Sequence, residues 1–379
     1  MYGVIQFNKG KLMLIFFFLG LIYDILYIER FEVNMNYLDN INKDTWEYFK
    51  VLEPDFPTWL IPYINTPAML KQQYISTMCG KNYTKLFNVD YYYSSLDHSI
   101  AVALIVWHFT HDKKQTLAGL FHDIATPTFK HCVDFLNGDY MRQESTENLT
   151  SYMISSSKEI MALLNKDNIK LEEVNDYHIY PIADNDTPKL SADRLEYSLS
   201  NALFNCRLEK LDTIREIYND ISVQTNEDGI AELGFNNLDV GLKFVWLTSV
   251  LSVIYRDDKT RYSMQLIADI LKDLSDLGIV TKEDLYTKKE DEMLELMCLN
   301  GYRDVIDTWS NACDILSSIE EPKDVYYVHH GAKVRYINPL VNNLRITDKS
   351  RVAQEMIDKN LAYDMSKYVY LDMKLERKL

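Results

Sequence analysis

The stretch HSIAVALIVWHFT, from His98 to Thr110, is followed after a short polar link by TLAGLFHDI, from Thr116 to Ile124. The first stretch is apolar on nearly every side, which is typical of a helix buried in a protein core. The second has the length of a short helix and ends shortly before Pro127. Together they predict two neighbouring core helices.

Most of the remaining sequence also favours helix, including Glu144–Leu164 and Ala192–Phe204, so we expect a mainly α fold. The segment VYYVHHGAKVRYINPL has β-branched and aromatic residues on both sides of its glycine, which predicts a β-hairpin near 325–340. We expect three parts: an apolar leader or mis-assigned start at 1–34, a helical core at 35–218, and a helical C-terminal region at 219–379 that carries the hairpin.

The 379 residues contain 40 Lys and Arg against 56 Asp and Glu, a net charge of −16. This surplus of acid disfavours nucleic acid as a partner, because such binding needs a basic surface. It suits a protein that holds divalent cations. The five cysteines include no CxxC pair, so neither a disulfide framework nor a structural zinc site is indicated. We therefore expect a reducing, cytoplasmic location.

The run LMLIFFFLGLIY, from Leu12 to Tyr23, follows two lysines and resembles the start of a signal peptide. It is shorter than the roughly 20 residues that a membrane-spanning helix needs. Three interpretations stay open: an upstream start-site artefact or dispensable leader before Met35, a signal or membrane anchor at 12–28, and a buried helix. Contact with a membrane is expected only through residues 12–28.

The residues that indicate chemistry are His98, the adjacent pair His122 and Asp123, and Asp193. Histidine and aspartate are common ligands of divalent metals. A His-Asp dipeptide alone is weak, since chance produces it often, and we interpret His111–Asp112 as a surface pair at a helix end. The other pair lies in the apolar helix TLAGLFHDI, where an unpartnered carboxylate would be costly to bury and a metal would satisfy it.

Three motifs in this order, HSIAVA at His98, GLFHDIATPTFKH from Gly119 to His131, and DRLEY from Asp193 to Tyr197, resemble the HD superfamily of metal-dependent phosphohydrolases. The chain is most similar to the branch of the deoxynucleoside triphosphate triphosphohydrolases. The resemblance covers about Pro67 to Ala202. It implies a helical HD domain as the metal-binding core.

The resemblance assigns the metal ligands as His98, His122, Asp123 and Asp193, with Mn²⁺, Mg²⁺, Fe²⁺ or Ni²⁺ as the ion. Asp123 is also expected to take part in catalysis by orienting a water molecule. For proton transfer the resemblance leaves two alternatives open, of which we favour Glu144 over His131. The expected substrate-binding residues are Asp134, Gln143, Tyr197, Lys333 and Arg335, the last two also being compatible with solvated hairpin positions.

Two departures separate this chain from the triphosphohydrolase branch. Thr126 stands where the branch has an additional histidine, and Ser95 stands where it has an arginine that contacts phosphate. Gln143 likewise replaces the histidine of a His-Glu pair. The leading hypothesis is a phosphohydrolase that cleaves a nucleotide or related phosphoester with a metal-activated water. The alternative is a catalytically degenerate HD-domain protein that senses a nucleotide. The branch also implies a homo-oligomer.

Overall fold

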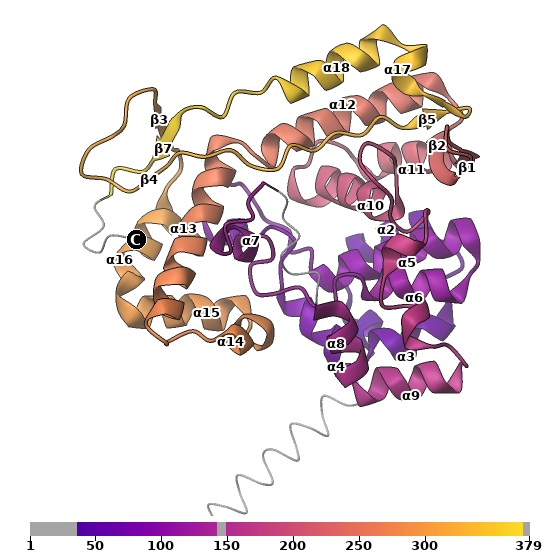
Figure 1. Ribbon diagram of the computed structural model, residues 1–379, viewed down its shortest axis with the longest axis horizontal. Coiled ribbons are helices and arrows are strands. Elements are labelled where there is room, and N and C mark those ends of the chain that lie inside the picture. Colours follow the sequence, from indigo (N-terminus) through magenta and orange to yellow (C-terminus); the bar gives the residue numbers. More distant parts are fainter. Residues whose placement is uncertain (1–35, 142–148, 374–379) are drawn as a thin grey trace, which may run out of the picture. The chain divides into compact units, whose positions relative to one another are not determined.

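The computed structural model describes residues 36–141 and 149–373 (Figure 1). The expected leader at 1–34, the apolar segment 12–28, Gln143 and Glu144 lie outside the described residues. The chain forms two units, Met1–Asn42 and Lys43–Leu379. In the first, the described residues include one turn of 3₁₀ helix at Tyr37–Asn40. The second is mainly α, as predicted, and the boundary expected after residue 218 lies within it.

The N-terminal part of the larger unit carries the elements that surround the candidate site. Its helices up to residue 141 are α2 (Lys43–Leu52), α3 (Ile61–Ile64), α4 (Pro67–Leu70), α5 (Ser95–Thr110), α6 (Lys113–Phe121) and α7 (Cys132–Leu136). From residue 149 they continue as α8 (Thr150–Ser156), α9 (Lys158–Lys166), α10 (Ala192–Ser200) and α11 (Leu211–Asn219), with a π-helical turn at Asn201–Asn205 after α10.

The predicted central helix is confirmed as α5, which begins three residues earlier than expected because Ser94 caps it. The Ser94 hydroxyl accepts from the amide of Asp97, and the Asp97 carboxylate accepts from the amide of Ser94. Residues from Ser95 to Val106 are all buried. Helix α5 packs against both α6 and α10. The apolar run Ile100–Val106 within α5 is consistent with this burial.

The C-terminal part adds the long helices α12 (Leu238–Ile254) and α13 (Asp258–Asp276). The shorter ones are α14 (Lys282–Thr287), α15 (Glu290–Met297), α16 (Arg303–Asn311), α17 (Ile346–Lys349) and α18 (Arg351–Leu361). Figure 1 shows α18 running alongside α12, while α13 packs against α7. No single helix in the described part of the chain is long and apolar enough to cross a membrane, although α12 and α13, bent by 48°, meet that test together.

Two small sheets replace the predicted hairpin near 325–340, which is wrong in its pairing. Strand β4 (Tyr327–Val328) pairs with β7 (Tyr368–Tyr370), which also pairs with β3 (Leu316–Ser318). The other sheet has the order β1 (Ile221–Thr225), β2 (Ala231–Phe235), β5 (Leu340–Val341) and β6 (Leu344–Arg345). The segment between β4 and β5 therefore links two sheets. Alternation of aromatic and β-branched residues indicates an extended backbone, but the partner is chosen by tertiary packing.

The C-terminal helices also contact the loops that contain Gly80 and Thr128. The amide of Thr128 donates to Leu285 O at 2.8 Å, and its hydroxyl donates to Lys288 O at 2.6 Å. Gly80 packs against the same region: a Cβ placed on it would lie 2.5 Å from Ile267 Cδ1 and 3.1 Å from Phe129 Cδ1. Ile267 and Phe129 are fully buried. Helix α13 and the loop around Phe129 therefore meet at a position that only glycine fills.

We predict that Gly80→Ala destabilises the protein more than Gly278→Ala does. Both glycines have a positive φ, +79° and +71°, but the space around Gly278 is open. Gly278→Ala should lower the free energy of unfolding by about 1 kcal/mol through backbone strain alone. Gly80→Ala should cost about 1–3 kcal/mol more through overpacking. Urea denaturation of the two variants measures the difference, and equal losses would refute the packing argument.

Candidate metal centre

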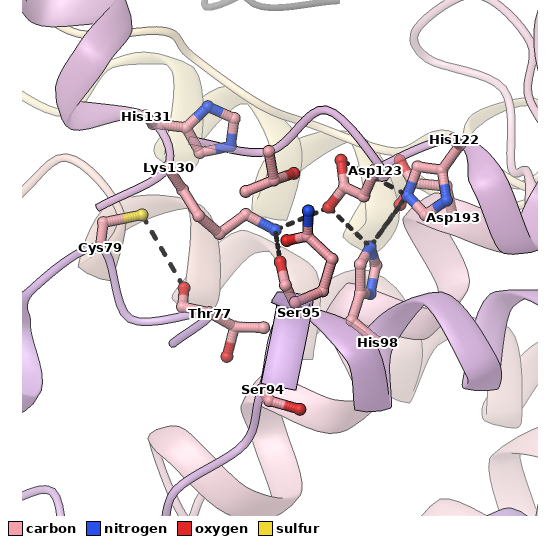
Figure 2. A network of polar contacts seen from close by, with 12 residues as sticks. Thr77, Cys79, Ser94, Ser95, His98, His122, Asp123, Lys130, His131 and Asp193 are labelled. Atoms are coloured by element: carbon pink, nitrogen blue, oxygen red, sulfur yellow. Dashed lines mark hydrogen bonds and ion pairs between the residues drawn. The ribbon is translucent and has the colours of Figure 1, made fainter. Parts of the chain in front are cut away.

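Three helix ends bring the four expected metal ligands together (Figure 2). His98 lies in the second turn of α5, and Asp193 lies in the first turn of α10, which Ser191 caps. Helix α6 ends at Phe121, so His122 and Asp123 lie in the turn that follows and not within the helix as the sequence predicted. A turn allows adjacent side chains to converge, whereas on a helix they would point about 100° apart.

The nitrogen and oxygen atoms of this cluster have the spacing of a coordination sphere. His98 Nε2 lies 3.2 Å from His122 Nε2 and 3.2 Å from Asp193 Oδ1. His122 Nε2 lies 3.6 Å from Asp193 Oδ1 and 3.8 Å from Asp123 Oδ1. Ligand atoms about 2.1 Å from one shared ion are roughly 3–3.5 Å apart. The two distances of 3.2 Å fall in this range, whereas the distances of 3.6 and 3.8 Å from His122 Nε2 and the 3.9 Å between His98 Nε2 and Asp123 Oδ2 are slightly longer, so the donor set could hold a divalent metal ion.

Three of the four residues form the group with the closest mutual spacing of ligand atoms. Ligand atoms of His98, His122 and Asp123 all lie within 4.8 Å of one another, and this group could hold a metal ion. Asp193 contacts both histidines through one oxygen, so it stands beside that group as a fourth donor. All four side chains are at least three-quarters buried.

The second ring nitrogen of each histidine is already bound by the protein. His98 Nδ1 donates to Glu196 Oε2, and His122 Nδ1 donates to Gly119 O at 2.7 Å. Such bonds fix the ring orientation and direct Nε2 to the metal, as is usual for metal-binding histidines. Glu196 is fully buried and also accepts from the Tyr93 hydroxyl at 2.7 Å. Glu196 was not among the expected site residues, although it lies three residues after Asp193 on the same helix.

The charges of the cluster shift the pKa values of its side chains. Burial disfavours the protonated form of His98, but the carboxylates of Glu196 and Asp193 outweigh it and raise its pKa to about 10. Burial likewise opposes the ionisation of Asp193, yet the hydrogen bond from His98 and the charge of His122 lower its pKa to about 2. Asp123 is held ionised as well, since Lys130 outweighs burial and keeps its pKa well below the ordinary value.

The cluster forms one wall of a cavity of about 510 Å³, within the size range of ligand pockets. Its lining includes five cationic side chains, of which Lys81, Lys130 and Arg194 come from the N-terminal part and Lys333 and Arg335 from the linker before β5. The expected substrate-binding residues Tyr197, Lys333 and Arg335 thus face the same space as the metal ligands.

The other expected site residues are placed as follows. His131 lines the cavity, and its Nδ1 donates to Oδ2 of the buried Asp134 at 2.9 Å. Asp134 holds His131 and is not among the lining residues. Thr126 is buried and also does not line the cavity. Arg345, a further basic residue near the predicted hairpin, is bound to Glu227 and Glu232 and takes no part in the lining.

No protein-family model matches the chain. The chain is 24% identical over 260 residues to "Uncharacterized protein YdhJ" of Bacillus subtilis (strain 168), an alignment that spans 65% of this chain and 73% of that protein. The name of this relative states no activity. The geometry of the site therefore carries the functional argument.

We predict that Mn²⁺ binding to the full-length protein releases about one proton at pH 7.5. His98 is protonated below a pKa of about 10 in the metal-free protein and must be neutral to bind a metal through Nε2. The apparent affinity should therefore rise about tenfold for each pH unit between roughly pH 6 and 9. Calorimetry in buffers of different ionisation enthalpy counts the proton, and a pH-independent affinity would contradict the assignment.

A second prediction concerns Glu196. Glu196→Gln removes the carboxylate behind His98, so we expect Mn²⁺ to bind about 10- to 100-fold more weakly. Glu232→Gln is the matched control, because Glu232 is also a fully buried carboxylate but lies outside the cavity lining, paired with Arg345. If both variants bound Mn²⁺ like the parent protein, Glu196 would have no role in orienting His98.

Proposed function

We propose that this protein is a metal-dependent phosphohydrolase that cleaves a nucleotide or a related phosphoester. The observation that carries the proposal is the shared cavity: the four candidate metal ligands lie on a wall of the same space that Lys130, Lys333 and Arg335 line. In a chain of net charge −16, cationic side chains gathered at an acidic metal centre favour an anionic ligand. The resemblance to HD-domain sequences supports the same class of reaction.

In this proposal the residues bind the metal, bind the substrate or transfer a proton. His98, His122, Asp123 and Asp193 would hold the divalent ion, which supplies Lewis-acid polarisation of phosphate oxygens and acidifies a water molecule. Lys130, Lys333 and Arg335 bind anionic oxygens of the substrate and keep them next to the ligands. Glu144, which lies outside the described residues, stays the favoured group for proton transfer. In the alternative, His131 has that role through Nε2, because its Nδ1 is bound to Asp134.

A nucleotide sensor without turnover is the second candidate, and one observation favours it. Position 126, where the triphosphohydrolase branch has a histidine, is a threonine that is buried and absent from the cavity lining. That position therefore supplies no acid or base. A sensor would show a nucleotide-dependent rise in melting temperature with no product under any of the four metals.

We predict that the full-length protein, loaded in turn with Mn²⁺, Mg²⁺, Fe²⁺ or Ni²⁺, releases phosphate, pyrophosphate or triphosphate from at least one member of a panel of nucleotides and simple phosphoesters. The double variant His122→Ala, Asp123→Ala should fall to the level of the metal-free protein, because it loses two of the four ligands. His329→Ala, a histidine outside the cavity lining, should keep the parent rate.

Chromatographic separation of the products checks this prediction and identifies the bond that is cleaved. Turnover by the double variant at the parent rate would refute a role for the cluster in hydrolysis. Binding of a nucleotide with no product under any metal would replace the phosphohydrolase by the sensor.

A further inference from the structure

The loop after Asp123 contains two successive residues in the left-handed region of backbone space. Phe129 has φ of 64° and Lys130 has φ of 45°. Residues with a bulky side chain rarely adopt this conformation, and they keep it only where the surrounding structure enforces it. Here the bonds of Thr128 to α14 and the linker after it fix the preceding residue, and the Phe129 ring is fully buried. Strain of this kind is concentrated at functional sites.

The strained backbone places the ammonium of Lys130 at the metal cluster (Figure 2). Lys130 Nζ lies 2.7 Å from Asp123 Oδ2 and 2.9 Å from Ser95 Oγ, and the side chain is only 10% exposed. An ammonium group is costly to bury unless it is paired. It has three N–H donors, and these two bonds use two of them. Since Lys130 lines the cavity, the third can meet an oxygen of a bound ligand.

Both oxygens of Asp123 lie near the histidines, since Oδ1 is 3.8 Å from His122 Nε2 and Oδ2 is 3.9 Å from His98 Nε2. Oδ2 is in addition bound by the ammonium of Lys130 at 2.7 Å. A second divalent ion bridged through Oδ2 would have to stand next to a positive charge in a buried site, where repulsion is strong. The position that a second cation would take is thus filled by the protein itself.

We propose that Lys130 takes the place of a second divalent cation: it neutralises Asp123 on one side of a single metal ion and binds an anionic oxygen of the ligand on the other. The part of this inference that concerns the ligand rests on the proposed function, since it assumes a phosphate-bearing molecule. Lys130 is then a ligand-binding cation of the centre, and its charge weakens metal binding at Asp123.

The test compares the full-length parent with Lys130→Met, Lys130→Asn and Lys130→Arg. Asparagine tolerates a positive φ, so Lys130→Asn removes the charge while relieving the backbone. Lys272→Met is the matched control, because Lys272 lies 2.7 Å from Asp276 on an exposed face of α13. Three quantities are measured: Mn²⁺ bound per chain, the affinity for Mn²⁺, and the affinity of the Mn²⁺-loaded protein for inorganic phosphate.

We expect the parent to bind one Mn²⁺ at this centre. Both uncharged variants should bind Mn²⁺ about tenfold or more tightly than the parent, because a positive charge next to Asp123 is gone. They should bind phosphate about tenfold or more weakly, because a charged hydrogen-bond donor is lost. Lys130→Arg should restore both affinities, and Lys272→Met should match the parent.

Three results would overturn the inference. One is a spin-coupled pair of Mn²⁺ ions in the parent, another is unchanged Mn²⁺ and phosphate affinity in both uncharged variants, and the third is failure of Lys130→Arg to restore them. None of these measurements needs turnover. Shifted affinities in a protein that hydrolyses no substrate would refute the proposed function alone, whereas hydrolysis with unshifted affinities would refute the role of Lys130 alone.

Discussion

The bond between His98 and the buried Glu196 is the constraint on which the rest of the centre depends. A carboxylate with no exposure needs partners, and here they are the ring of His98 and the hydroxyls of Tyr48, Tyr93 and Ser200. These partners come from α2, from the segment before α5, from α5 itself and from α10. By binding Nδ1 of His98, Glu196 leaves Nε2 as the atom that faces His122 and Asp193.

That constraint explains why α5 and α10 must meet closely. Asp193 and Glu196 are three residues apart on α10, so they lie on one face of the helix, one on each side of the His98 ring. Helix α6 then has to end where it does, because only the turn after Phe121 brings His122 and Asp123 to the same point. Lys130 and protonated His98 compensate the carboxylates of the cluster, and a bound divalent ion would take over the compensating charge of the His98 proton.

The sequence was sufficient for the parts of this structure that are set locally. An apolar run from His98 to Thr110 has few alternatives to a buried helix, and the mainly α class followed from such runs. The cluster residues could be named because their order resembles that of the HD-domain motifs. The hairpin near Gly331 could not be predicted correctly, since β4 pairs with the distant strand Tyr368–Tyr370 and β5 pairs with the distant strand Ala231–Phe235 and with β6 (Leu344–Arg345) that follows it. Lys130 and Glu196 were missed for a related reason: a single charged residue shows its role only when its buried partner is known.

The surplus of acid in the composition gives a misleading impression of the site. Averaged over the chain it opposes anion binding, yet the cavity gathers basic residues from both halves, with Lys333 and Arg335 supplied by the linker between β4 and β5. This linker joins two different sheets and runs along the cavity. If the segment folded into a local hairpin, it could not take this course. The C-terminal part therefore contributes to the cavity in two ways. The linker supplies lining residues, and Leu285 and Lys288 accept hydrogen bonds from Thr128 in the loop before Phe129. Residues on both sides of the boundary expected after residue 218 therefore line one cavity with the candidate metal ligands.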